Sequence, residues 1–173
     1  MALLITDQLI EDYWHLLEDG AEITKSDNNI VSVERWQRDR DKLIPRCGQL
    51  GILLKSNEPP DLIEDDIYHF NVICLDFPKF TDGRAYSYAR LLREKYRFTG
   101  ELRAVGNVLR DQLAFMRRCG INAFEISDDA NVENWSAAFN EISIRYQGAN
   151  DNANVVRPDA ATVAGDVAGN WSY

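Results

Sequence analysis

The sequence predicts an α/β domain with a mainly parallel sheet of βα units and an N-terminal hairpin. Short apolar runs recur between Leu50 and Ile142, as expected for strands that are buried on both faces. Between these runs lie segments whose apolar residues repeat at helical spacing. Neighbouring parallel strands require a crossover, which is almost always right-handed. Helices are therefore expected to cover the faces of the sheet.

Two architectures satisfy this pattern, an open doubly wound sheet and a partial barrel. The pattern leaves the choice between them open, because both join parallel strands through helices. A closed eight-stranded barrel is excluded, since the chain offers too few βα units to complete one.

The N-terminal part of the chain precedes the repeated βα units. Residues 3–5 and 9–14 are short apolar stretches that predict a hairpin or strand pair, and residues 18–29 predict a loop. Ser32 is predicted to cap a helix that Pro45 ends. The residues that share one face of this helix are Val33, Trp36 and Leu43.

The βα units follow from Leu50 onward. The predicted strands are 50–56, 71–77, 101–106 and 121–127. The predicted helices are a short one that starts at 57–60, one over 84–96, one over 107–119, and a last one that carries Val132, Trp135, Phe139 and Ile142. In the third helix, Asn107 is the predicted N-cap and Gly120 the left-handed residue at the C-terminus. Residues 142–147 overlap the last helix and are alternatively a short strand.

The composition changes near the C-terminus. Residues 148–173 are small, polar and aperiodic, which is typical of disorder. We therefore expect a single α/β domain over residues 1–147 and a disordered C-terminal tail over 148–173.

The net charge of −9 argues against nucleic acid and anionic membranes as partners. Nucleic-acid binding requires a basic surface that displaces phosphate counterions, and binding to an anionic membrane requires a similar surface. The N-terminus has no basic stretch before an apolar core, and no apolar run reaches the length of a membrane-spanning helix. The sequence thus predicts a cytoplasmic protein that binds neither nucleic acid nor membrane.

The three cysteines, Cys47, Cys74 and Cys119, show no spacing typical of zinc or iron–sulfur ligands. We interpret them as reduced thiols of a cytoplasmic protein, and we predict no metal site. The sequence also lacks the glycine-rich fingerprints of nucleotide-binding loops and the nucleophile elbow of hydrolases, so no cofactor is predicted and no reaction is identified.

A ligand site in a parallel sheet is expected beyond the carboxyl ends of the strands. Polar residues follow two predicted strands there, and Ser127-Asp128-Asp129 follows a third. Cations beside a helix N-terminus suit an anion, so a site for an anionic ligand is one hypothesis. The alternative is that Asp82 only caps the helix while Lys79 and Arg84 are solvated. The candidate residues are Asp76, Lys79, Asp82, Arg84, Arg103, Asn107, Arg110, Asp111 and Gln112.

Arg103 is unusual because it lies in the middle of a predicted strand. A buried charge there is costly unless it is paired, and Asp76 on the neighbouring strand is the expected partner. Such a pair would be structural or would line a polar pocket. Alternatively, the strand lies at an edge of the sheet and its charges reach water.

The segment from Phe77 to Ile126 resembles a bacterial family of unknown function. Its genes commonly lie beside the haemoprotein subunit of assimilatory sulfite reductase, and its members are often labelled probable oxidoreductases. The resemblance covers about residues 1–147. The matching elements are Phe77-Pro78-Lys79-Phe80, Asp82-Gly83-Arg84, Arg90-Leu91-Leu92-Arg93, Gly100-Glu101-Leu102-Arg103-Ala104, Asp111-Gln112-Leu113, Arg118-Cys119-Gly120 and Arg145-Tyr146-Gln147.

The resemblance implies an accessory protein of assimilatory sulfite reduction, within sulfur assimilation and cysteine biosynthesis, with the haemoprotein subunit as its partner. It carries over no established catalytic residue. The family usually has an aspartate where this chain has Asn107, which keeps the expected cap and removes a charge. The alternative function is a small enzyme or binding domain for an anionic ligand at the strand carboxyl ends.

Overall fold

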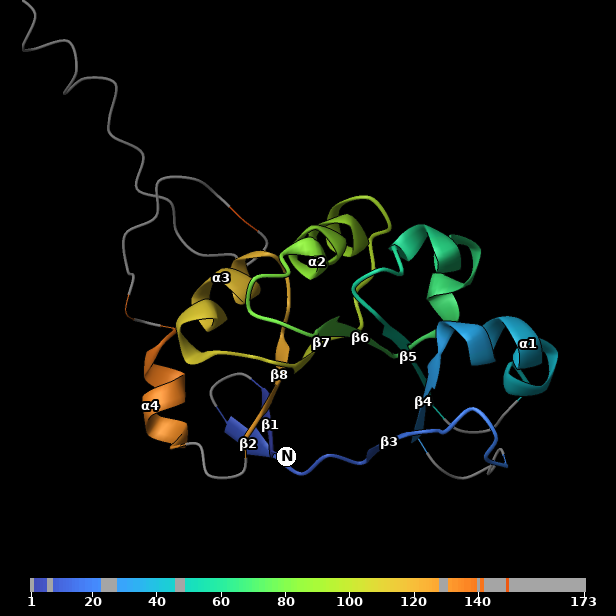
Figure 1. Cartoon of the computed structure of the whole chain (residues 1–173), viewed down its shortest axis with the longest axis horizontal. Coiled ribbons are helices and arrows are strands. Elements are labelled where there is room, and N and C mark those ends of the chain that lie inside the picture. Colours follow the sequence, from blue (N-terminus) through green and yellow to red (C-terminus); the bar gives the residue numbers. More distant parts are fainter. Residues whose placement is uncertain are drawn as a thin grey trace, which may run out of the picture.

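In the computed structural model, the residues described are 2–5, 8–22, 28–45, 49–127, 131–139, 141 and 149. They form one eight-stranded sheet in the order β2-β1-β8-β7-β6-β5-β4-β3, which curls into a half-barrel (Figure 1). The strands are β1 (Ala2–Ile5), β2 (Gln8–Ile10), β3 (Trp14–Leu16), β4 (Asn28–Ser32), β5 (Leu50–Leu54), β6 (Val72–Phe77), β7 (Glu101–Gly106) and β8 (Ala123–Ile126).

Strands β3 to β8 run parallel to one another, whereas β1 pairs antiparallel with both β2 and β8. The mainly parallel α/β sheet and the N-terminal hairpin are thus confirmed. Along the chain, β4 to β8 are added side by side in a single direction. A doubly wound sheet would reverse this direction, so the partial barrel is the observed architecture.

The direction of winding explains where the helices lie. Successive right-handed crossovers in one direction place every connection on the same side of the sheet. Figure 1 shows the helices between β4 and β8 on the outer, convex face. The expectation that helices cover both faces is therefore wrong. The helices are α1 (Val33–Leu43), η1 (Pro60–His69), α2 (Arg84–Glu94), η2 (Arg110–Gln112), α3 (Leu113–Arg118) and α4 (Val132–Ala137), where η marks a 3-10 helix.

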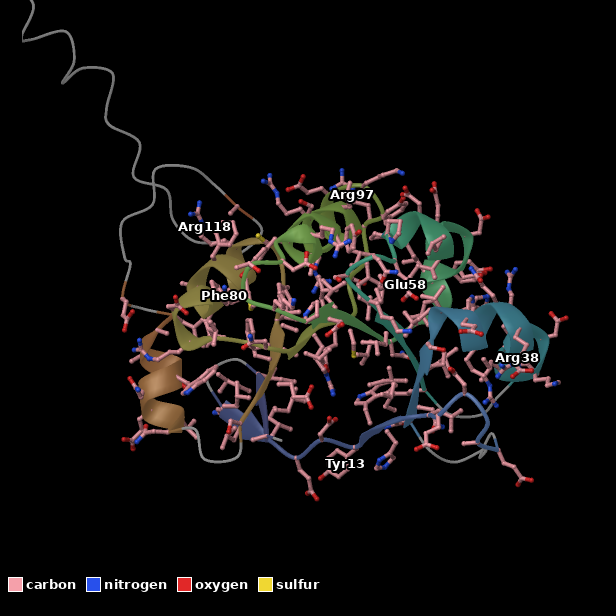
Figure 2. All side chains as sticks on the ribbon, in the orientation of Figure 1. Tyr13, Arg38, Glu58, Phe80, Arg97 and Arg118 are labelled. Carbon is pink, nitrogen blue, oxygen red and sulfur yellow. The ribbon has the colours of Figure 1, made fainter. Side chains whose placement is uncertain are left out.

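The inner, concave face is crossed by the segment Glu11–Tyr13, here called the crossing segment. It leads from β2 at one edge of the sheet to β3 at the other, across the open side of the half-barrel (Figure 1). Tyr13 lies on it (Figure 2). The concave face thus has a cover of extended chain in place of helices.

The main core lies between the convex face and the helices. Alternate residues of the central strands, such as Ile52, Ile73 and Leu102, are fully buried there against Trp36 of α1 and Leu92 of α2. A smaller cluster on the concave face joins Ile30, Val72 and Cys74. Burial of both faces explains why β5 and β6 are continuous apolar runs.

The predicted helix ends are confirmed at two places. The Ser32 side chain accepts a hydrogen bond from the Arg35 backbone N–H at 3.0 Å, as expected for an N-cap. Gly120 has a φ of 101°, the left-handed conformation that glycine adopts most easily.

The helix predicted over 107–119 is shorter than expected. Asn107 is not its N-cap, because the Asn107 N–H donates to the Phe77 carbonyl at 2.7 Å and extends the pairing of β6 with β7. Helical structure begins only at Arg110, first as η2 and then as α3. The pairing of strand ends therefore replaces the first helical turn.

Several expectations fall outside the described residues. These are the short strand at 142–147, Cys47, and residues 148–173 except 149. Within the described part of the chain, no helix has the length and hydrophobicity needed to cross a bilayer.

Candidate functional site

The carboxyl ends of β5, β6 and β7 form the edge at which a site was expected. Since these strands are neighbours in the sheet, Ser56 after β5, Asp76 within β6 and Gly106 at the end of β7 come to the same edge. A Cβ atom on Gly106 would lie 2.9 Å from Asp76 Oδ1, so the aspartate packs directly against this glycine. Gly106 has a φ of 90°, which also favours glycine there.

A hydrogen-bonded network lies beside Asp76 at the start of α2. Arg84 Nε donates to Asp82 Oδ1 at 2.9 Å, and Arg84 Nη2 donates to Asp82 Oδ2 at 2.6 Å. The same Nη2 donates to Ser56 Oγ at 3.1 Å. Tyr88, one turn further along α2, donates its hydroxyl to the Ser56 carbonyl at 3.1 Å. The network therefore fixes α2 to the end of β5.

The pKa values of Asp82 and Asp76 are shifted in opposite directions by these surroundings. Hydrogen bonds from Arg84 hold the pKa of the Asp82 carboxyl well below its usual value. Burial raises the pKa of Asp76, and the nearby charge of Asp82 raises it further, while Lys55 opposes the shift. Asp76 is therefore the carboxylate of this edge whose charged form the fold disfavours.

This asymmetry predicts the effect of Asp76→Asn on stability. A carboxyl whose pKa is higher in the folded than in the unfolded protein costs stability above both values, and the cost vanishes as the pH falls below them. Asp76→Asn should therefore raise the urea midpoint at pH 7, and the gain should shrink as the pH is lowered through the acidic range. Urea unfolding of both proteins across this range measures the difference. A variant less stable than the parent at pH 7 would contradict the assignment.

The other candidates at this edge lie outside this network. The side chains of Lys79, Asn107 and Asp111 are exposed. Gln112 Nε2 lies 3.4 Å from the Phe80 carbonyl and so links η2 to the loop before α2. Arg110 instead points toward the C-terminal part of the fold, where it donates to the Asn134 carbonyl at 2.8 Å and pairs with Glu141. The structure thus brings Asp76, Asp82 and Arg84 together and directs Arg110 elsewhere.

Arg103 belongs to a different part of the molecule, the concave face. Its side chain is 3% exposed and pairs with Asp12 of the crossing segment through two hydrogen bonds of 2.7 and 3.2 Å. Arg103 Nε also donates to Glu101 at 2.8 Å. Burial alone would lower the pKa of Arg103, but these carboxylates outweigh it and hold the value above normal.

The prediction that Asp76 pairs with Arg103 is therefore wrong. In the register of β6 with β7, Asp76 faces Val105, whereas Cys74 faces Arg103. The guanidinium points away from Asp76, toward Glu101 and the amino end of β7. A charge in a central strand is paired, as expected, but its main partner comes from the crossing segment.

The arrangement has a clear consequence for anion binding. The guanidinium groups of Arg84, Arg103 and Arg110 each pair with a carboxylate. Lys79 is the candidate cation for which the described residues show no such pairing. The charge of the edge is thus largely compensated, which leaves less positive potential for an anion than the residue types suggested.

Two residues of this edge were absent from the sequence-based set, Ser56 and Lys55. The signal was present, because both directly follow the apolar run of β5, to which the same carboxyl-end rule applies. Tyr88 gave no such signal, since its position on the helical stripe of α2 is explained equally well by packing.

The cysteine and acidic side chains of the described residues do not form a metal site. Cys74 and Cys119 are buried free thiols, and burial raises the pKa of Cys74 to about 12, so its thiol stays protonated. Among the described residues, no group of three or more histidine, cysteine, aspartate or glutamate side chains is placed to hold a metal ion.

Comparison with known protein families gives a match. The model of a family described as bacterial protein of unknown function, DUF934, matches residues 51–156, which is more than half of the chain. No curated protein matches the chain. The matched region contains β5 to β8 and the whole carboxyl edge described above.

Proposed function

Because the chain belongs to the bacterial family of unknown function DUF934, we propose that it is an accessory protein of assimilatory sulfite reduction. It acts in cysteine biosynthesis, in the cytoplasm, together with the sulfite reductase haemoprotein subunit. The observation that carries the proposal is the resemblance of residues 77–126 to a bacterial family whose genes we expect to lie beside the gene for that subunit. The family match includes this segment entirely.

The surface of the same segment supports a protein partner. Four large apolar side chains are exposed on it, Leu91 of α2 and the three residues Phe80, Leu109 and Phe115. The last three are neighbours, since Gln112 connects to the carbonyls of Phe80 and Leu109, and Phe115 packs on Tyr86 at a ring distance of 5.0 Å. Exposed aromatic residues are enriched in the centres of protein interfaces. We assign this apolar patch to contact with the haemoprotein subunit.

Deletion of the gene tests the proposed pathway. The deletion strain should grow poorly with sulfate or sulfite as the sole sulfur source and normally with sulfide or cysteine, because only the first two require sulfite reduction. A plasmid copy of the full chain should restore growth. Normal growth of the deletion strain on sulfate would refute the pathway, and a defect on sulfate alone would place the role before sulfite.

Complementation also tests the patch. Phe80→Glu places a charge in the patch and should fail to restore growth, whereas Tyr13→Glu, an exposed aromatic on the crossing segment, should restore it. Equal complementation by both variants would remove the patch from the proposal while leaving the pathway intact.

A further inference from the structure

The opposite end of the sheet contains a cavity of about 500 Å³, beside the amino ends of β6 and β7. It lies between η1 and the connection from α2 to β7, far along the strands from the carboxyl edge. Its volume falls within the usual range of small-molecule sites. None of the candidate site residues lines it.

Four of the ten residues that line the cavity are aromatic, and the others include polar and charged side chains. Phe70 and Phe98 are buried, while Tyr68 is 76% exposed and Tyr96 partly so. The Tyr96 hydroxyl is held between Asp61 and Glu64, so its ring is fixed. Such rings offer a flat apolar surface to a ligand ring.

The connection from α2 to β7, which contributes to the lining of the cavity, is held by several contacts. Arg93 Nη1 donates to the carbonyls of Phe98 and Gly100 at 2.6 and 2.9 Å, which fixes the connection to β7. A Cβ atom on Gly100 would lie 2.5 Å from the Phe98 ring and 2.6 Å from the Asn71 carbonyl. These contacts hold the connection from α2 to β7 in place beside the cavity.

Arg97 supplies a positive charge that the protein itself does not use. Among the described residues, its guanidinium has neither a hydrogen-bond nor an ion-pair partner. Glu64, the acidic residue in the lining, is already engaged by Lys95 at 3.7 Å and by Tyr96. Arg97 has a φ of 56°, just after the end of α2, where glycine is the usual residue. The side chain thus occupies a backbone position that disfavours it.

We propose that this cavity binds a small aromatic anion, whose ring packs against the aromatic residues of the lining and whose carboxylate or phosphate pairs with Arg97. A guanidinium binds either group through two parallel hydrogen bonds. The inference is independent of the proposed role in sulfite reduction, since it concerns a different end of the molecule.

NMR titration of the full chain tests the proposal with three probes: adenosine monophosphate, benzoate and inorganic phosphate. One or both aromatic anions should shift the amide signals of Thr99 and Gly100, and the pair distinguishes a phosphate from a carboxylate ligand. Inorganic phosphate should shift them much less. Equal shifts with inorganic phosphate, or no shift with either aromatic anion at millimolar concentration, would overturn the proposal.

The variant Arg97→Gly separates binding from folding. It should weaken binding by roughly tenfold or more, because a charge-assisted pair is lost. It should also raise the melting temperature by about 2–4 °C, since glycine suits the left-handed backbone. Arg90→Gln is the matched control, because Arg90 lies exposed on α2 and pairs with Glu94 outside the cavity. Undiminished binding by Arg97→Gly would refute the role of Arg97.

Discussion

Replacing Arg103 by methionine should lower the free energy of unfolding by about 3 kcal/mol, one of the largest losses expected for a single substitution in this protein. The guanidinium is buried and pairs with Asp12 and Glu101. Its removal leaves these carboxylates beside Glu125 on the concave face without a cation. The value is taken from the lower part of the range for buried pairs, because the Asp12 side chain is 30% exposed and retains some water.

A double-mutant cycle with Asp12→Asn tests the cause of this loss. If the pair fixes the crossing segment to β7, the double variant should lose clearly less stability than the two single losses summed. Arg90→Met is the matched control, since its exposed ion pair with Glu94 is worth only about 0.3–0.5 kcal/mol. Urea unfolding measures the four proteins of the cycle and the Arg90→Met control. An Arg103→Met loss below about 1 kcal/mol, or strictly additive losses, would show that the pair does not hold the crossing segment.

The Arg103 pair also shows which features of the fold can be predicted from local sequence and which cannot. Strands β5 to β8 could be predicted from their short, mostly apolar runs, whereas β4 was not predicted, since residues 18–29 were expected to be a loop. Helix α1 could be predicted because Ser32, Trp36 and Pro45 give its start, its inner face and its end. The partner of Arg103 could not, because Asp12 lies 91 residues away in a segment with no periodicity. The curl that brings the two together is a property of the whole sheet.

The same difference between local and long-range contacts applies to the carboxyl edge of the sheet, where positions could be predicted and side-chain pairs could not. The rule for strand carboxyl ends correctly placed Asp76, Asp82 and Arg84 at one edge. It could not show that Arg84 binds Asp82, or that Arg110 turns toward Glu141, because side-chain pairing depends on contacts between elements. Residue types therefore indicated which side chains share this edge better than how those side chains pair. The cavity beside Arg97 gave no sequence signal, since the rule selects the opposite end of the strands.

Trp36→Ala should destabilise the protein by roughly 3–5 kcal/mol, the range for removing a large aromatic residue from a core. Trp36 is 1% exposed and packs edge-on against Phe70 at a ring distance of 4.8 Å. Its indole Nε1 donates to Asp66 at 2.8 Å, and Asp66 also pairs with Arg40. The tryptophan thus joins α1 to η1 through both apolar and polar contacts.

Trp36→Phe separates these two contributions. Phenylalanine keeps most of the apolar contact but leaves a buried oxygen of Asp66 without its indole donor, which costs about 1–3 kcal/mol. Adding Asp66→Asn to Trp36→Phe removes that buried charge and should recover part of the loss, whereas Asp66→Asn in the parent should only destabilise. Thermal and urea unfolding measure the four proteins. If Trp36→Phe is as stable as the parent, the indole hydrogen bond contributes nothing and α1 is held to η1 by apolar packing alone.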